Sequence, residues 1–307
     1  MRFVVEHIKD YMAAYPITEF VGKSMREGWV DHVHVSKPWY WCMVPNRLSE
    51  LAQTIALIRS FPQVTDEELL QILQRIYEET AYQRAEIHEW VDSRHNAGSA
   101  MINAMAQSCA ILDDFPSAHK WLAERAGMVK QYIDQAFYPD GMCVELTTAY
   151  SASVSVYMQQ LAYALRDEEA MRASRERLKA LVTSMVGLSD PIGWLPSYGD
   201  CYATTLPEYI HQPLAEWLDL PWVRTVLQHG NGPQPPFTTW PCPGQEQWSG
   251  YYAMRSGWDS QARFLAIDGW KRLPIWTPGC CRASRRPCGR SRTRAPRARH
   301  WRTTPTA

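Results

Sequence analysis

Residues 65–83 read TDEELLQILQRIYEETAYQ. Thr65 and Glu68 form a capping box, in which each side chain can bond the backbone N–H of the other, and such a pair marks the start of a helix. Apolar side chains then recur at spacings of three and four: Leu69, Leu70, Leu73, Ile76 and Tyr77. This spacing predicts an amphipathic α-helix with one broad face towards a core.

The same helical spacing recurs along most of the chain. It is found in residues 47–61, 101–112, 115–137, 151–167, 168–188 and 206–218. Because the connections between these segments are short, neighbouring helices should run antiparallel. We predict a mainly α fold with at least six helices in residues 47–230, arranged as antiparallel hairpins, and strands only after Gly250.

The character of the sequence changes near residue 231. Residues 230–250, GNGPQPPFTTWPCPGQEQWSG, are rich in Pro and Gly and cannot continue a helix. Residues 250–270 then alternate loosely and carry aromatic and β-branched side chains, which predicts two short strands joined at 258–261. The predicted parts are a helical domain at 1–230, a linker at 231–249, strands at 250–270 and a tail at 271–307.

The tail is strongly basic. Residues 271–307 hold 11 of the 32 Lys and Arg residues and no Asp or Glu, so residues 1–270 carry a net charge of −11. The tail shows neither the helical spacing of apolar residues nor the alternation of a strand. Its bias towards Pro, Arg, Ser and Thr is typical of disorder. Three interpretations stay open: an arm that binds polyanions, an ordinary solvated tail, or translation in a shifted reading frame. The abrupt change within a β region favours the shifted frame.

The sequence shows no sign of export or membrane insertion. No stretch approaches the roughly 18 to 20 apolar residues that span a bilayer. Glu6, His7, Lys9 and Asp10 stand where a signal peptide would have its apolar run. The five cysteines of residues 1–270 show no CxxC spacing and indicate neither a disulfide framework nor a zinc cage. We expect most of them to be buried thiols.

Two stretches carry more polar chemistry than a core requires. Residues 92–101, DSRHNAGSAM, place Arg94, His95 and Asn96 together at the start of a helix, although a cap needs only one of them. Residues 138–150, YPDGMCVELTTAY, contain a turn, then Glu145, then Tyr150 at the start of the next helix.

Together these motifs resemble the heparinase II/III-like polysaccharide lyases. The resemblance covers residues 88–269 and depends on five motifs that stand in the order found in that family. They are His95-Asn96, FPSAHKW (115–121), PDGMCVELTTAY (139–150), LPSYGD (195–200) and YYAMRSGWDSQARFLAIDG (251–269). The resemblance implies an (α/α) toroid of antiparallel helical hairpins, followed by the first strands of a truncated antiparallel β-sandwich.

The resemblance also implies β-elimination on a uronate-containing acidic polysaccharide of the heparin/heparan or alginate type. In that reaction Asn96, or His95 beside it, would neutralise the substrate carboxylate, and Tyr150 would be the catalytic acid and base. The chemistry is reasonable, because the C5 proton becomes acidic only when donors mask the carboxylate charge. A tyrosine can take that proton if its neighbours lower its pKa from about 10.

Five further residues are expected to bind substrate: Arg94, Glu145, Trp194, Tyr198 and Asp200. The aromatic faces among them could stack on sugar rings, as could those of Trp39, Tyr40 and Trp41. Simpler roles stay open, namely a helix cap for His95 or Asn96 and core packing for the aromatic side chains, Tyr150 included. A hydrolase carboxylate pair formed by Glu145 and Asp200 is a further alternative.

The chain departs from the family after Gly269. The family's β domain continues with a histidine-rich stretch that supplies another catalytic histidine and often metal ligands, whereas Trp270 and the basic tail follow here. We therefore expect impaired activity, and a carbohydrate-binding or inert remnant stays open. His32 and His34 lack a third ligand at useful spacing, so no metal or other cofactor is expected in this chain.

The expected partner is an acidic polysaccharide or oligosaccharide. No specific nucleic acid and no membrane are expected, and the sequence leaves the oligomeric state open. Members of this family are usually periplasmic or secreted, yet the N-terminus shows no signal peptide, so the localisation also stays open.

Overall fold

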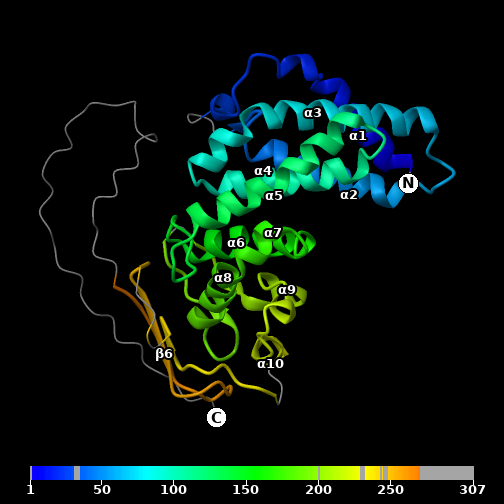
Figure 1. The fold of residues 1–307 in the computed structure, drawn as a ribbon. Coiled ribbons are helices and arrows are strands. Elements are labelled where there is room, and N and C mark those ends of the chain that lie inside the picture. The colour runs from blue at the N-terminus through cyan, green and yellow to red at the C-terminus, as the bar shows by residue number, and fades with distance from the viewer. Residues whose placement is uncertain are drawn as a thin grey trace, which may run out of the picture. The chain divides into compact units, whose positions relative to one another are not determined.

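The computed structural model describes residues 2–30, 35–199, 201–228, 232–242, 244 and 248–269. These residues are mostly helical (Figure 1). The α-helices are α1 (Arg2–Ala14), α2 (Met43–Ile58), α3 (Asp66–Asp92), α4 (Asn96–Ile111), α5 (Pro116–Ala136), α6 (Thr148–Ala164), α7 (Glu169–Ala173), α8 (Arg175–Leu188), α9 (Gln212–Trp217) and α10 (Trp222–Gln228). The strands are β1 (Trp29–Val30), β2 (Val35–Ser36), β3 (Trp194–Leu195), β4 (Thr204–Thr205), β5 (Thr239–Trp240), β6 (Tyr251–Arg255) and β7 (Phe264–Asp268).

Helix α3 begins at the predicted capping box. Thr65 Oγ1 accepts a hydrogen bond from Glu68 N at 3.2 Å, and Glu68 Oε2 accepts one from Thr65 N at 3.2 Å. Ile72 and Ile76 on the apolar face of α3 are fully buried. The predicted helix and its capping box are therefore confirmed, whereas Leu70, which was expected on the inward face, is 60% exposed.

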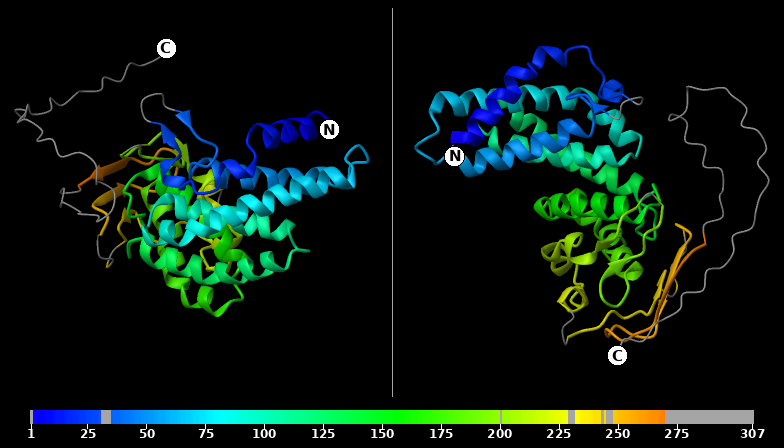
Figure 2. Two further views of the ribbon diagram at one scale, coloured as in Figure 1. Left: turned by 90° about the horizontal axis from the view of Figure 1, so that it is seen from above. Right: turned by 180° about the vertical axis from the view of Figure 1, so that it is seen from behind.

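Helix α4 lies at the centre of the packing and contacts α2, α3, α5 and α6. Figure 2 shows the helices of this part of the chain lying side by side. The α4 side chains Met101, Ile102 and Met105 are fully buried. A Cβ on Gly98 would lie 2.9 Å from both Trp90 O and Tyr132 Cε2, so glycine allows α4 to approach those residues closely.

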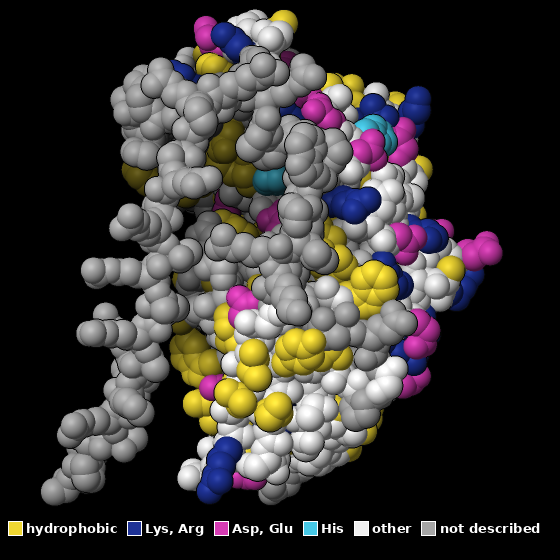
Figure 3. Space-filling model, turned by 90° about the vertical axis from the view of Figure 1, so that its left-hand side faces the viewer, with side chains coloured by type: hydrophobic (Ala, Val, Ile, Leu, Met, Phe, Trp, Pro, Cys, Tyr) yellow, Lys and Arg dark blue, Asp and Glu magenta, His cyan; other side chains and the backbone are white. Residues whose placement is uncertain are grey.

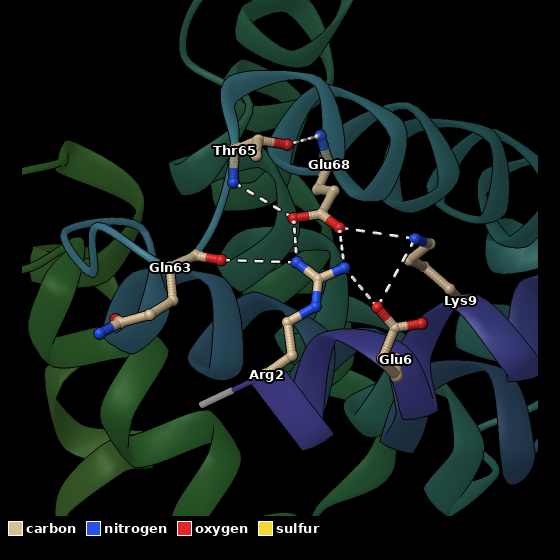
Figure 4. A network of polar contacts seen from close by, with 6 residues as sticks. All are labelled: Arg2, Glu6, Lys9, Gln63, Thr65 and Glu68. Carbon is tan, nitrogen blue, oxygen red and sulfur yellow. Dashed lines mark hydrogen bonds and ion pairs between the residues drawn. The ribbon is translucent and has the colours of Figure 1, made fainter.

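Helix α1 was not expected from the sequence, and ion pairs hold it on α3 (Figure 4). Arg2 Nη1 and Nη2 donate to the two carboxylate oxygens of Glu68, at 3.0 and 2.6 Å. Lys9 Nζ lies 3.4 Å from the same carboxylate, and Glu6 pairs with Arg2. One carboxylate of the α3 capping box therefore also anchors the N-terminal helix.

A second carboxylate, that of Glu79, lies fully buried between α1, α2 and α3. Glu79 Oε2 accepts from Arg47 Nη2 at 2.6 Å, and Oε1 accepts from Arg75 Nε at 2.6 Å and Tyr11 O–H at 2.8 Å. A buried charge is tolerated only when it is paired in this way.

Two details differ from the prediction for residues 47–230. The segment 168–188 is not one helix, because α7 ends before Ser174 and α8 begins after it. Strands also occur before Gly250, so the expectation of strands only after Gly250 is wrong. Strand pairs of two residues, such as β3 with β4, are too short for a sequence period to reveal.

Strands β5, β6 and β7 form an antiparallel sheet in that order. β6 and β7 are the two strands predicted after residue 250, and β5 lies within the stretch expected to be a linker. One face is buried through Tyr251, Ala253 and Arg255. The other face exposes four apolar side chains, those of Tyr252, Met254, Leu265 and Ile267. Figure 3 shows hydrophobic side chains gathered on the lower part of its view.

Other expectations concern cysteines, membranes and the tail. Cys109 and Cys143 are buried, and Cys42, Cys201 and Cys242 are partly buried. No helix in the described part of the chain is long and apolar enough to cross a membrane. His32, His34, Asp200 and the tail 271–307 lie outside the described residues.

Candidate functional site

A tight corner between α3 and α4 presents the first group of candidate residues. Only Ser93, Arg94 and His95 separate the two helices. Arg94 is exposed and adopts a left-handed backbone with φ 60°, which costs a non-glycine residue about 1–2 kcal/mol. The turn at Arg94 allows His95 to become the N-cap of α4 directly after α3 ends.

His95 lies between two tryptophan rings. Its ring is edge-on to Trp41, with centroids 5.1 Å apart, and to Trp90, with centroids 5.3 Å apart. Its Nδ1 accepts a hydrogen bond from Ala97 N at 3.1 Å, so the neutral ring carries its proton on Nε2.

The surroundings of His95 favour the neutral ring. Burial lowers its pKa, the carboxylate of Glu145 acts in the opposite direction, and the guanidinium of Arg26 lowers the pKa further. His95 therefore offers a neutral N–H donor near pH 7.

Asn96 is held by Glu145. Asn96 N donates to Glu145 Oε1 at 2.5 Å, and Asn96 Nδ2 donates to Glu145 Oε2 at 2.9 Å. Both oxygens of the carboxylate thus bond to the same residue at the N-terminus of α4, where a negative charge is favourable. This pair joins the first and third sequence motifs, which are 49 residues apart.

The turn before Glu145 connects the site to the sheet. Asp140 is buried, and its Oδ2 accepts from Trp248 N at 3.0 Å and from Ser249 N at 2.8 Å. A Cβ on Gly141, which has φ 92°, would lie 2.1 Å from Ala180 O, so only glycine fits there. The motif PDG therefore packs between α8 and the start of β6.

Helix α6 begins just after Glu145 and carries Tyr150 in its first turn. Thr147 is the N-cap and accepts from Tyr150 N at 3.2 Å. Thr148 Oγ1 donates to Pro196 O at 2.5 Å and accepts from Tyr198 N at 3.2 Å. The motif LPSYGD thus folds against the helix start that carries Tyr150, whose side chain is 36% exposed.

The fifth motif reaches the same place. The ring of Tyr251 in β6 stacks on Tyr198, with centroids 4.9 Å apart and planes at 19°. Tyr251 O–H also donates to Leu146 O. Leu146 has a left-handed backbone with φ 52°, as Arg94 does, so one strained residue directly precedes His95 and another directly follows Glu145.

The remaining predicted residues are placed as follows. Trp194 on β3 is 45% exposed. Tyr198 is partly buried, and the ring of Tyr251 covers one of its faces, so that face cannot stack on a sugar ring. Asp200 lies outside the described residues, so the hydrolase pair with Glu145 stays a prediction. In the FPSAHKW motif, Phe115 and Trp121 stack on Tyr77 rather than on the His95 corner.

Three residues that support the site were missed from the sequence. Trp90 contacts the His95 ring, and Tyr132 O–H donates to His95 O at 3.0 Å. Arg26 stacks over Trp90 at 4.4 Å and pairs with Glu89 at 2.9 Å. Helical periodicity marks Trp90 and Tyr132 only as core residues, and Arg26 carries no motif.

The arrangement can mask a negative charge. The exposed guanidinium of Arg94, the neutral N–H of His95 and the carboxamide of Asn96 lie on successive residues of one corner. Donors of this kind stabilise a developing oxyanion when they are fixed in place beforehand. No group of three or more His, Cys, Asp or Glu side chains that could hold a metal ion occurs among the described residues.

Comparison with known proteins agrees with the motifs. The family model for the heparinase II/III N-terminus matches residues 3–220, which confirms the resemblance. A search of curated proteins found no match.

Solved structures show the same fold. A heparinase III is similar with TM-score 0.64 and 16% identity, over 86% of this chain and 42% of that chain. A heparan sulfate lyase from Pedobacter heparinus is similar with TM-score 0.56 and 18% identity, over 86% of this chain and 40% of that one. The chain thus spans about two fifths of the length of these proteins. At such identities the likeness shows the fold alone, which is an (α/α) toroid of helical hairpins.

The family model covers well over half of the 307 residues, and the fold agrees with it. The chain therefore belongs to the heparinase II/III family.

Proposed function

We propose that this protein is a polysaccharide lyase that cleaves a uronate-containing acidic polysaccharide by β-elimination. The observation that supports this most directly is the bond between Asn96 and Glu145, which fixes a carboxamide donor beside His95. The matched structures include a heparan sulfate lyase, which makes heparan-type chains the first substrates to test.

The donors of the corner would bind the uronate carboxylate. The amide N–H of Asn96 and the Nε2–H of His95 would donate hydrogen bonds to the carboxylate oxygens, which take up negative charge when C5 loses its proton. Arg94, which is exposed beside them, would add a positive charge. This stabilisation of the enolate-like state is the step that lowers the barrier.

Tyr150 would move the proton. Its phenolate takes the proton from C5, the electron pair forms the C4–C5 double bond, and the bond from C4 to the glycosidic oxygen breaks. The phenol then gives its proton to the departing oxygen. No water is added, and no oxidant or reductant takes part.

The product distinguishes this proposal from its alternatives. The 307-residue chain is incubated with heparan sulfate, heparin and alginate at high protein concentration, and products are followed by ultraviolet absorbance and mass spectrometry. We expect formation of unsaturated uronate ends, the product that β-elimination requires. Saturated products that have gained water would indicate a hydrolase instead, and calorimetric binding without any product would indicate a carbohydrate-binding protein.

A further inference from the structure

We propose that Glu145 is a positioning residue that orients the carboxamide of Asn96 and does not itself bind the sugar. This inference depends on the proposed function above, because it states how one donor of that site is held. It replaces the expectation from the sequence that Glu145 contacts substrate.

The first reason is that both carboxylate oxygens are already engaged. Oε1 accepts from Asn96 N and Oε2 from Asn96 Nδ2, so the two bonds form a ring that includes the backbone and the side chain of one residue. Such paired bonds to a charged group are strong and directional. A sugar hydroxyl would have to compete with both of them.

The second reason is the chemistry of the carboxamide. Its nitrogen carries two hydrogens and its oxygen carries none, so only one of its two orientations presents a donor to an anion. With one hydrogen on Glu145, the second hydrogen of Asn96 Nδ2 would be left to donate to a ligand. Without the carboxylate, the amide could turn and present Oδ1, which would repel a uronate carboxylate.

The third reason is electrostatic. A free carboxylate at this position would repel an anionic substrate. Held by Asn96 at the N-terminus of α4, the same charge is partly compensated by the helix and acts on the ligand through the amide. The charge of Glu145 also acts on His95, the second donor, because it opposes the lowering of the His95 pKa by burial.

The backbone next to His95 and Glu145 is also held in a fixed conformation. Arg94 and Leu146 both adopt positive φ, at 60° and 52°, directly before His95 and directly after Glu145. Leu146 O accepts from Tyr251 O–H, which ties this strained segment to β6. Strain of this kind persists only where the surrounding structure enforces one geometry.

The test is a double-mutant cycle of Glu145→Gln and Asn96→Ala. It measures kcat from the unsaturated product and Kd for a uronate oligosaccharide by calorimetry. We expect Glu145→Gln to lower kcat about 10²-fold, the loss typical of a misplaced reacting or donor group. In the Asn96→Ala background it should have no further effect, because the group that it orients is gone. An equal loss in both backgrounds, or no loss in either, would overturn the proposal.

A reciprocal exchange separates positioning from stability. In the double variant Asn96→Asp with Glu145→Gln, the introduced amide can donate to the introduced carboxylate, so the melting temperature should return towards that of the parent. Substrate affinity and rate should stay low, because a carboxylate now faces the uronate. Recovery of all three quantities would mean that the pair is only structural. Glu176→Gln is the control, since this carboxylate is 82% exposed on α8.

Failure of the proposed function would be recognised separately. If the parent chain binds uronates without forming unsaturated product, the lyase proposal fails, while the same cycle read through Kd still tests Glu145. NMR of the Asn96 side-chain amide gives an independent readout. Its two protons should exchange more rapidly in Glu145→Gln, and unchanged exchange would contradict the proposed orientation.

Discussion

The ring of Tyr198 stacks on the ring of Tyr251, with their centroids 4.9 Å apart and their planes at 19°. Tyr198 belongs to the loop that packs on the start of α6, and Tyr251 begins β6. Because Tyr251 also bonds Leu146 O, a strand of the sheet holds the segment that carries Glu145. The candidate site is therefore supported from the helical part and from the sheet.

The phenol of Tyr150 should be essential for turnover. Tyr150→Phe removes the hydroxyl that would carry the proton, and we expect a rate loss of at least about 10²- to 10⁴-fold, the contribution of a general acid–base. The fold should persist, because the side chain is 36% exposed. Tyr157→Phe on the same helix is the matched control, and its rate of unsaturated product formation should equal that of the parent. Full activity of Tyr150→Phe would remove this residue from the mechanism.

Gly98 should be required for the packing beneath His95. In Gly98→Ala the new Cβ would lie 2.9 Å from Trp90 O and Tyr132 Cε2, and overpacking of this kind costs about 1–3 kcal/mol. Gly127 in α5 has no atom within 4 Å of such a Cβ. Gly127→Ala should therefore stabilise the protein by about 0.5–1 kcal/mol, since alanine favours a helix over glycine. Urea denaturation measures both, and a stabilised Gly98→Ala would contradict the packing described here.

His95 should contribute to the pH dependence of stability. Its folded pKa is lowered, mainly by burial, from about 6.5 in the unfolded chain. Below about pH 6.5 the unfolded chain therefore binds more protons at this position, and stability falls as the pH decreases through that window. His95→Asn keeps a capping acceptor and removes the titration, so its melting temperature should fall less between pH 7.5 and pH 5.

Two other histidines serve to interpret that measurement. Burial also lowers the pKa of His211, which remains in both proteins and keeps part of the pH dependence. His119→Asn is the control, because its side chain is 61% exposed. An identical pH dependence in the parent and in His95→Asn would show that His95 keeps its ordinary pKa.

The buried carboxylate of Glu79 should be critical for the N-terminal helices. Glu79→Gln removes the charge that pairs with Arg47 and Arg75, and breaking a buried ion pair typically costs about 3–5 kcal/mol. Glu78→Gln, one residue earlier, changes a side chain whose described bond is to Gln74 on the same helix, and should shift the free energy of unfolding by less than about 0.5 kcal/mol. Equal effects of the two substitutions, compared by urea denaturation, would contradict a special role for the buried group.

Periodicity was sufficient to predict the long helices, because each buries an apolar face that recurs every three to four residues. It could not reveal α1, whose position depends on Glu68 and Glu79, which lie more than 50 residues along the chain. It also missed the break at Ser174 and the two-residue strands, which leave no repeating pattern. The order of the motifs did predict the family, because this order can be read from the sequence without knowing which distant residues are in contact.

For the site, the sequence indicated which residues carry polar chemistry but not how they are paired. Nothing in the spacing of Asn96 and Glu145 shows that they bond, and the capping role of His95 Nδ1 depends on the short α3–α4 corner. Trp90 and Tyr132 look like ordinary core residues in the sequence. The convergence of Tyr150 with His95 and Asn96 on one cleft stays a prediction.

The bonds of Asp140 to Trp248 and of Leu146 to Tyr251 close loops of 108 and 105 residues, whereas the helical hairpins form between neighbours in the sequence. Closing so long a loop lowers the chain entropy before the contacts form that offset this loss. Distant pairings therefore form late in folding. The helices should thus form early, and the segment that carries Glu145 should gain its final geometry only when β6 arrives. Pulse-labelled hydrogen exchange during refolding would show this order, with protection at Ser249 and Trp248 appearing after that of α3 and α4.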